Sequence, residues 1–285
     1  MANRYEPQRE YAQFKALVER ILSSVGESLA DSESSSQELV LEAIYRGLTY
    51  PQMGGNPVES EDQGIGLAEA TARQYGSNIT RKVNQGLERL YLFDRGVRPV
   101  NKETLVQTLE SHWDEIENAL SLLKRINDLY GRIEDLLQRE DFEEADKRTA
   151  EIIWRVAGTW ETEEETDERT FRTDRVMNFP CVELRNIDRI WTEYSDGRFG
   201  FSTQKRIWLS DRVRRDISKF MRLVGWARLG ENDDGTPTFV YLNRQGIDFS
   251  CNAPEGQFPW LVAYRRSSAD GQDREAYLRR IEDCI

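Results

Sequence analysis

The decapeptide SDGRFGFSTQ, Ser195–Gln204, places two glycines and two phenylalanines between polar residues. Gly197 and Gly200 allow backbone angles that other residues rarely adopt, so they predict a tight turn. Phe199 and Phe201 flank Gly200, and their rings point to opposite sides if this part of the backbone is extended. One ring would then anchor the core while the other lines a cavity. In the alternative, both rings belong to the core and the turn is purely structural.

Amphipathic helices are predicted on both sides of this stretch. Apolar residues recur every three or four positions in Phe142–Val156, Leu184–Trp191 and Val213–Val224, which is the spacing of one buried helix face. Asp141 and Glu144 form a capping box that predicts the start of the first of these helices.

The segment after the decapeptide is first basic and then β-rich. Seven cations occur with only two acids, Asp211 and Asp216; the cations are Lys205, Arg206, Arg212, Arg214, Arg215, Lys219 and Arg222. They indicate either a site for propionates or an acidic partner, or a solvated helix face. Thr238–Ser250 holds two short β-rich runs around a polar turn, which predicts a small hairpin.

The N-terminal half is predicted to be helical and resembles a helix-turn-helix. Leu39–Gly47 would open this motif, with Thr49 as a helix N-cap, and Ser77–Phe93 is the candidate recognition helix, with Arg81, Lys82 and Arg89 on its outer faces. Three interpretations stay open: a helical packing module, a DNA-binding module and a module that docks a protein partner.

The predicted domain organisation has three parts. Residues 1–100 form the helix-turn-helix-like domain, and an apolar stripe from Leu105 to Ile126 predicts a single connecting helix over residues 101–129. Residues 130–285 form the second domain. The predicted fold class is mainly α, with at most a small hairpin.

Composition limits the classes of function. The 285 residues carry a net charge of −12, which disfavours nucleic acid and anionic membranes outside a local basic patch. His112 is the single histidine, so a catalytic triad and a multi-histidine metal site are nearly excluded. The three widely spaced cysteines argue against a disulfide framework and predict reduced thiols. Without a long apolar run, we expect a cytoplasmic protein that is not integral to a membrane.

A set of motifs in roughly residues 130–266 resembles a known family. The set comprises DFEEADKRT, then NFPCVELRNIDRIWTEYSDGRFGFSTQKRIWL, then Gly225-Trp226, then FSCNAPEGQFPWL. It resembles the genomes-uncoupled-four family of tetrapyrrole-binding magnesium-chelatase regulators. The core of the resemblance is S-x-G-x-FGFS-x-Q followed by AP-x-G-x-x-P. The segment YLNRQGIDF lacks the tryptophans typical of the family, and Gln257 stands where a histidine is common.

The resemblance implies an all-helical domain shaped like a cupped hand. It implies that the domain binds protoporphyrin IX or its magnesium form. It also implies that the protein activates magnesium chelatase in chlorophyll biosynthesis, with the large chelatase subunit as its partner. Such a protein has no catalytic activity and no catalytic cofactor of its own. It further implies that the protein belongs to a cyanobacterial-type cell, where it can associate peripherally with membranes. The alternative function is a signalling or interaction protein whose N-terminal domain recruits DNA or a protein partner, with the second domain as ligand sensor or scaffold.

The candidate tetrapyrrole contacts lie in the decapeptide, in the following basic helix and in the downstream loop. In the family a mobile loop through AP-x-G covers the porphyrin, and an arginine shortly after the loop is implicated in binding. The expected set is Phe199, Arg206, Tyr241, Phe249, Pro254, Phe258, Arg265 and Arg266. No residue is expected to be catalytic or to bind a metal.

Overall fold

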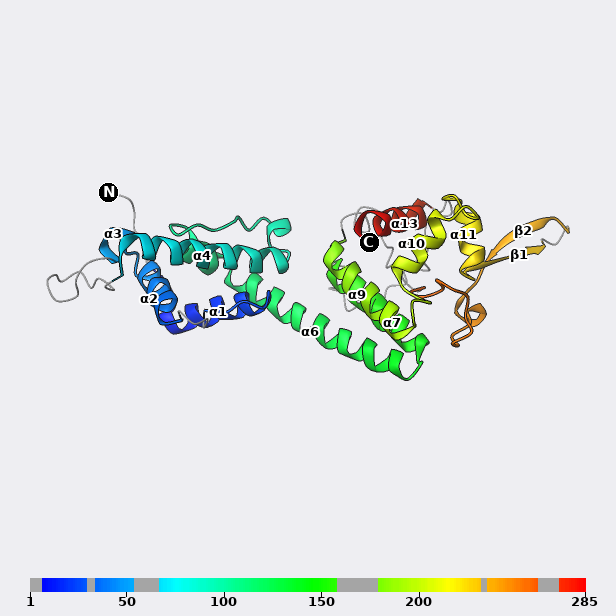
Figure 1. Cartoon of the computed structure of the whole chain (residues 1–285), viewed down its shortest axis with the longest axis horizontal. Helices are drawn as coiled ribbons and strands as arrows, with labels where there is room; N and C mark the ends of the chain where they lie inside the picture. The colour runs from blue at the N-terminus through cyan, green and yellow to red at the C-terminus, as the bar shows by residue number, and fades with distance from the viewer. Residues whose placement is uncertain (1–6, 30–33, 54–66, 158–178, 232–234, 261–271) are drawn as a thin grey trace. The chain divides into compact units, whose positions relative to one another are not determined.

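The computed structural model describes residues 7–29, 34–53, 67–157, 179–231, 235–260 and 272–285 (Figure 1). The chain divides into two compact units, Met1–Lys124 and Arg125–Ile285. The described residues are mostly helical, and the only sheet among them is a two-stranded hairpin. This confirms the predicted fold class, mainly α with at most a small hairpin.

The first unit is built from helices around one apolar core. Its elements are α1 (Tyr11–Ser23), α2 (Ser34–Tyr45), α3 (Tyr50–Met53), α4 (Glu69–Arg89), the 3-10 helix η1 (Phe93–Arg95) and α5 (Leu105–Ser111). Phe14, Leu17 and Ile21 of α1 and Ile79, Val83 and Leu87 of α4 are buried in this core. Gly86 lets α4 approach α1 closely, because a Cβ atom there would lie 2.6 Å from the carbonyl oxygen of Ile21.

One part of the predicted recognition helix is wrong. Arg81 is exposed on α4 as expected, but Lys82 is only 6% exposed. The ammonium group of Lys82 lies 2.9 Å from the carboxylate of Glu27 and donates to the carbonyl oxygen of Ser28. A buried ammonium requires such partners, so Lys82 belongs to the interior of the unit and is not on an outer face.

The connecting segment is not one helix. His112 interrupts it with non-helical angles, φ −114° and ψ 24°, so that α5 ends at Ser111 and α6 runs from Trp113 to Gln138. The apolar stripe was predicted correctly, since Leu105, Leu109 and Ile116 are buried in the core of the first unit.

The second unit begins within α6, and three of its helices were predicted: α7 (Phe142–Val156), α9 (Cys181–Tyr194) and α11 (Ile217–Leu223). Helices α10 (Phe201–Leu209) and α13 (Gln272–Cys284) were not predicted. The side chain of Asp141 accepts a hydrogen bond from the backbone N–H of Glu144, which confirms the predicted cap of α7.

The predicted helix over Val213–Val224 is too long at its N-terminus. Arg214 and Arg215 have φ angles of 51° and 58°, and α11 begins only at Ile217, with Asp216 as its N-cap. A left-handed backbone cannot continue an α-helix. The apolar spacing was nevertheless informative, because Val213 is buried.

The hairpin exists, but with a different pairing from the one expected. Strand β1 (Ala227–Glu231) pairs antiparallel with β2 (Pro237–Tyr241), while the predicted polar turn contains the 3-10 helix η2 (Arg244–Gly246) and the second predicted run is not a strand. The run ARLGE lacks the β-branched and aromatic residues that signal a strand, so its pairing is recognisable only in the folded chain.

The cysteines also differ from the expectation. Cys181 at the start of α9 and Cys284 at the end of α13 form a disulfide, with a Cα–Cα distance of 4.9 Å across 103 residues of sequence. The third cysteine, Cys251, is free and exposed. Spacing along the chain could not reveal this pair, because the packing of α13 against α9 brings the two residues together.

Candidate functional site

The two characteristic sequence motifs bind each other through the backbone. The N–H of Gly200 donates to the carbonyl oxygen of Phe258 at 3.0 Å, and the N–H of Gly256 donates to the carbonyl oxygen of Arg198 at 2.9 Å. The guanidinium group of Arg198 donates to the carbonyl oxygen of Ala253. The decapeptide therefore holds the downstream loop, residues 253–260, in place.

Gln204, the last residue of the decapeptide, is fully buried and uses both ends of its amide. Its Nε2 group donates to the carbonyl oxygens of Gly256 and Pro259, each at 3.1 Å. Its Oε1 atom accepts from the hydroxyl of Tyr277 at 2.9 Å. Burial raises the pKa of the Tyr277 phenol well above its ordinary value, so this hydroxyl remains a donor. Gln204 thus joins the loop to α13.

Gly200 is required by the contact between α9 and α10. Its φ angle is 116°, and a Cβ atom there would lie 2.7 Å from Thr192 Oγ1 and 2.8 Å from Asp188 Oδ1. Asp188 Oδ1 accepts a hydrogen bond from the N–H of Ser202 at 2.7 Å. Asp188 therefore supplies the cap that α10 lacks in its own sequence.

The two phenylalanines of the decapeptide are both buried, but in different surroundings. Phe199 packs edge-to-face against Phe142 and Phe258, with ring centroids 5.3 and 5.0 Å apart. Phe201 instead packs edge-to-face against Tyr277 of α13. Both rings therefore belong to the core, as in the second of the two alternatives drawn from the sequence.

The predicted contact residues on the loop fall into two groups. Phe258 is completely buried, whereas Phe249 is half-buried and stacks on it with a centroid distance of 5.5 Å. Pro254 is also half-buried and lies against Gly225. Only Phe249 and Pro254 of these three have side chains that reach the surface, so a ligand contact by Phe258 or Phe199 requires the loop to move.

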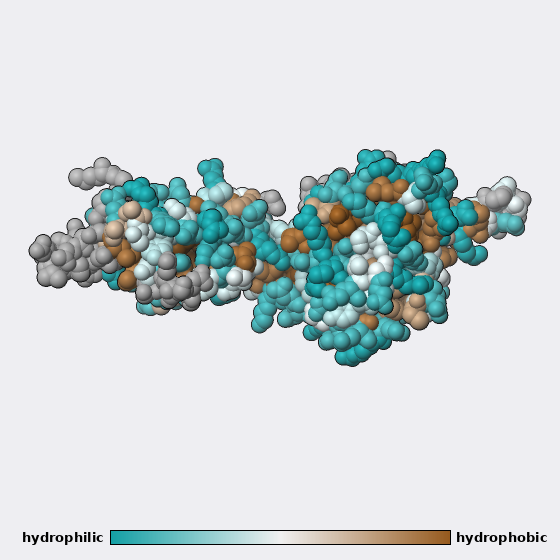
Figure 2. All heavy atoms as spheres, viewed as in Figure 1, coloured by the Kyte–Doolittle hydropathy of each residue, from teal (hydrophilic) through white to brown (hydrophobic). Residues whose placement is uncertain are grey.

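The largest exposed side chains of the second unit include two on one face of the hairpin. In the antiparallel register Leu229 lies opposite Phe239 and Ala227 opposite Tyr241, so these residues share a face. Leu229 is 57% exposed and Tyr241 is 49% exposed. Figure 2 shows apolar residues at the surface where the hairpin leaves this unit. We name Leu229, Phe239 and Tyr241 the hairpin face.

Cationic groups lie beside this face and beside the loop. The guanidinium carbon of Arg274 lies 4.2 Å from the ring centroid of Tyr241. Arg206 is exposed and forms an ion pair with Glu255 at 2.7 Å, which places it next to the AP-x-G motif. Arg265 and Arg266 lie outside the described residues. The structure thus places Arg206 near Pro254 and leaves Tyr241 on the separate hairpin face.

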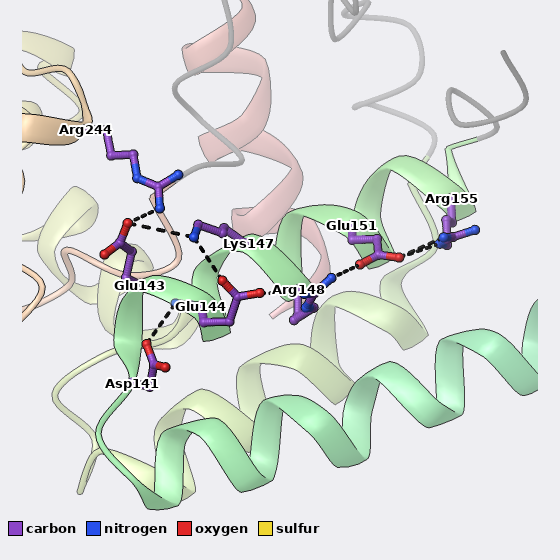
Figure 3. A network of polar contacts seen from close by, with 8 residues as sticks. All are labelled: Asp141, Glu143, Glu144, Lys147, Arg148, Glu151, Arg155 and Arg244. Atoms are coloured by element: carbon purple, nitrogen blue, oxygen red, sulfur yellow. Dashed lines mark hydrogen bonds and ion pairs between the residues drawn. The ribbon is translucent and has the colours of Figure 1, made fainter. Parts of the chain in front are cut away.

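A ladder of ion pairs on α7 connects the loop after the hairpin to the body of the unit (Figure 3). Arg244 of η2 pairs with Glu143, whose carboxylate also lies 3.8 Å from Lys147. Glu144 accepts from Lys147, and this hydrogen bond is the main reason why its pKa is lowered. Arg148 adds a second ion pair to Glu144, at 2.5 Å. Exposed pairs of this kind contribute little stability individually, but they restrict the position of Arg244.

The described residues contain no cluster of metal ligands and no membrane-spanning helix. No three His, Cys, Asp or Glu side chains among them are grouped so that they could hold a metal ion. None of the helices in the described ranges combines the length and the apolar character needed to cross a bilayer.

Sequence reasoning missed Leu229, Phe239 and Arg274. The alternation of Phe239 and Tyr241 along the chain could have identified one half of the face. Leu229 lies in a strand without a strand signal, and Arg274 belongs to a helix that follows residues 261–271, so only the folded chain brings them to Tyr241.

Two curated relatives resemble part of this chain. The Ycf53-like protein of Synechocystis sp. is 27% identical over 169 residues, which are 59% of this chain and 66% of that protein. The chloroplastic tetrapyrrole-binding protein of Arabidopsis thaliana is 26% identical over 132 residues, which are 46% of this chain and 43% of that protein. The matches therefore span between 43% and 66% of the length of these relatives.

A solved structure and a family model complete the comparison. The ligand-free structure of Arabidopsis thaliana GUN4 has 21% identity and a TM-score of 0.37, with coverage of 54% of this chain and 90% of that chain. The family model described as GUN4-like matches residues 124–271, beginning at the boundary between the two units. This match covers more than half of the 285 residues, and the chain therefore belongs to the GUN4-like family.

Proposed function

We propose that the second unit binds a tetrapyrrole, protoporphyrin IX or its magnesium form, and that the chain is a regulator without catalysis of its own. The observation that carries this proposal is the hairpin face, an exposed apolar surface with a cation at its edge, in a chain of the GUN4-like family. A relative named as a tetrapyrrole-binding protein supports the same ligand class.

The chemistry of the hairpin face suits a flat ligand. A porphyrin is an apolar disc with two propionate groups, and its faces pack well against aromatic and aliphatic side chains. Covering a few hundred Å² of apolar surface at ~25 cal/mol per Å² contributes roughly 5 kcal/mol before ordering costs. Leu229, Phe239 and Tyr241 supply such a surface without unfolding any part of the core.

The propionates require cations at the edge of the disc. Arg274 stands over the ring of Tyr241, where its guanidinium group can donate to a carboxylate. Arg206 would first have to leave Glu255. Arg265 and Arg266 remain predicted contacts from the resemblance. A magnesium ion in the ring can take water as its axial ligand, so a protein ligand is not required.

The binding test is a titration with deuteroporphyrin and magnesium deuteroporphyrin, followed by tryptophan quenching and the shift of the Soret band. We expect saturable binding with a micromolar or lower Kd. Tyr241→Ala and Arg274→Gln are each expected to raise Kd about tenfold, because each removes a contact worth roughly 1.4 kcal/mol.

A matched pair of leucines provides the control. Leu229→Ala on the hairpin face is expected to weaken binding, whereas Leu39→Ala, the same change at a leucine of the first unit that is 40% exposed, is expected to leave Kd unchanged. Absence of saturable binding to both porphyrins would refute the ligand class. Tight binding that none of the hairpin variants alters would refute the location.

We further propose that the bound chain activates magnesium chelatase in chlorophyll biosynthesis through its large subunit, in the cytoplasm of a cyanobacterial-type cell or at its membrane surfaces. The test is chelatase turnover with purified subunits, with and without this chain. Stimulation that is lost with Tyr241→Ala supports the proposal. Unchanged turnover together with salt-sensitive binding of DNA would favour the alternative, a signalling protein that acts through its first unit.

A further inference from the structure

Helix α13 lies outside the matched family region. The GUN4-like match ends at residue 271, and α13 begins at Gln272. The helix packs against α9 and α10, as Figure 1 also shows for α10. Its last residue, Cys284, is bonded covalently to Cys181, the first residue of α9. The disulfide thus joins this helix to α9 in the body of the second unit.

Non-covalent contacts hold α13 along the same side. Tyr277 donates to Gln204, and Ile281 and Leu278 are buried. Three cations of the unit donate to oxygens at the C-terminal end of α13. They are Arg185 to the carbonyl oxygen of Cys284, Lys205 to the carbonyl oxygen of Glu282, and Arg215 to the carboxylate of Glu282. The hydrogen bond from Arg215 is the main reason why the pKa of Glu282 is lowered.

The position of α13 affects the loop that follows the hairpin. Gln204 bonds Tyr277 on one side and the carbonyl oxygens of Gly256 and Pro259 on the other. A displacement of α13 removes the hydroxyl from Gln204 and leaves a buried amide oxygen without its donor, which is costly. The state of the disulfide is therefore coupled to the two sequence motifs through a single buried side chain.

The two sulfur atoms differ in accessibility. Cys181 is half-buried, whereas Cys284 is 3% exposed. An incoming thiolate can therefore attack Cys181 more readily, with Cys284 as the leaving thiolate. Cys181 lies in the first turn of the 14-residue helix α9, where the helix dipole favours negative charge. This position makes Cys181 a good leaving group when the mixed disulfide is resolved.

We propose that Cys181–Cys284 is a reversible dithiol–disulfide site whose reduction loosens α13 and, through Gln204, the loop at residues 253–260. The reductant is a dithiol. Its two thiols form a disulfide, the Cys181–Cys284 bond breaks, and two electrons and two protons pass to the two cysteines. In a reducing cytoplasm, where we expect this chain, disulfides are mostly transient and redox-active. This site goes beyond the proposed function and needs no tetrapyrrole.

The first measurement is the thiol count of the full chain after incubation in mixtures of oxidised and reduced dithiothreitol. After acid quenching and alkylation, we expect one alkylated cysteine, Cys251, in the oxidised chain and three in the reduced chain, with both species interconverting in the folded state. Three alkylated cysteines under all conditions would refute the bond. A bond that is reduced only after unfolding would refute its reversibility.

The second measurement is hydrogen exchange of the α13 amides in both states. We expect exchange at least about tenfold faster after reduction, because the bond closes a long loop and local opening then becomes less costly. Cys181→Ser is expected to exchange like the reduced chain under oxidising conditions, whereas Cys251→Ser is expected to match the unmodified chain. Equal exchange rates of the α13 amides in the oxidised and reduced states would refute the loosening of α13. Equal rates for the amides of residues 253–260 in the two states would refute the coupling through Gln204.

Discussion

Replacing Gln204 with leucine should destabilise the second unit strongly, because it removes three buried hydrogen bonds at nearly constant volume. The carbonyl oxygens of Gly256 and Pro259 lose their donor, and the Tyr277 hydroxyl loses its acceptor. An orphaned buried polar group costs about 1–3 kcal/mol. Three such groups give a loss of roughly 3–9 kcal/mol in the free energy of unfolding, a large share of the about 5–15 kcal/mol of a typical domain.

A second substitution separates the contribution of α13. Tyr277→Phe leaves both carbonyl oxygens paired and orphans only Gln204 Oε1, so we expect a loss of about 1–2 kcal/mol. In the double variant Gln204→Leu/Tyr277→Phe, neither the hydroxyl nor the amide oxygen is present, so only the two carbonyl oxygens stay orphaned. The losses of the two single variants should therefore sum to more than the loss of the double variant, by roughly 2 kcal/mol.

The assay is denaturant unfolding monitored by tryptophan fluorescence. Six of the seven tryptophans lie in residues 125–285, so the signal reports mainly the second unit. The control is Gln245→Leu at an exposed glutamine of η2, which should change the free energy of unfolding by less than about 0.5 kcal/mol. A loss below about 1 kcal/mol for Gln204→Leu would refute this account of the motif.

Three further predictions concern glycines and pH. Gly200→Ala should lower the free energy of unfolding by about 2–4 kcal/mol, because φ is 116° and the new Cβ atom would meet two side-chain oxygens of α9 at 2.7 and 2.8 Å. Its control is Gly197→Ala, where φ is 76° but no atom lies within 4 Å of the new Cβ atom. Gly197→Ala should lower the free energy of unfolding by only about 1 kcal/mol in the same denaturant assay. Gly131→Ala should raise the midpoint of thermal unfolding, since nothing lies within 4 Å of the new atom and alanine is favoured in the middle of α6 by about 0.8–1 kcal/mol. Basic partners hold the pKa values of Glu144 and Glu282 below their ordinary values. Each ionised carboxylate therefore adds to the stability of the folded protein above the ordinary carboxyl pKa of about 4.3, and this contribution is lost as the pH falls through the lowered pKa of the folded state. Unfolding curves of Glu144→Gln and Glu282→Gln between neutral and acid pH should show a smaller loss of stability on acidification, and an unchanged pH profile would contradict this assignment.

Local features of this protein could be predicted from the sequence because each depends on residues close together in the chain. The apolar spacing of Phe142–Val156 and Leu184–Trp191 predicted their helices and buried faces, and Asp141 was recognisable as a cap. The FGFS and AP-x-G motifs carried the family resemblance. Periodicity failed where the backbone itself changes, as in the left-handed turn at Arg214 and Arg215.

The candidate site depends on contacts between distant parts of the chain, and only the tertiary structure decided them. Gln204 meets Tyr277 from 73 residues away, and Cys181 meets Cys284 across 103 residues. The register of β1 and β2 brings Leu229 to the face of Tyr241. Such pairings follow from the packing of whole helices and strands against one another, and no spacing in the sequence encodes which distant polar group or thiol will complete a buried contact.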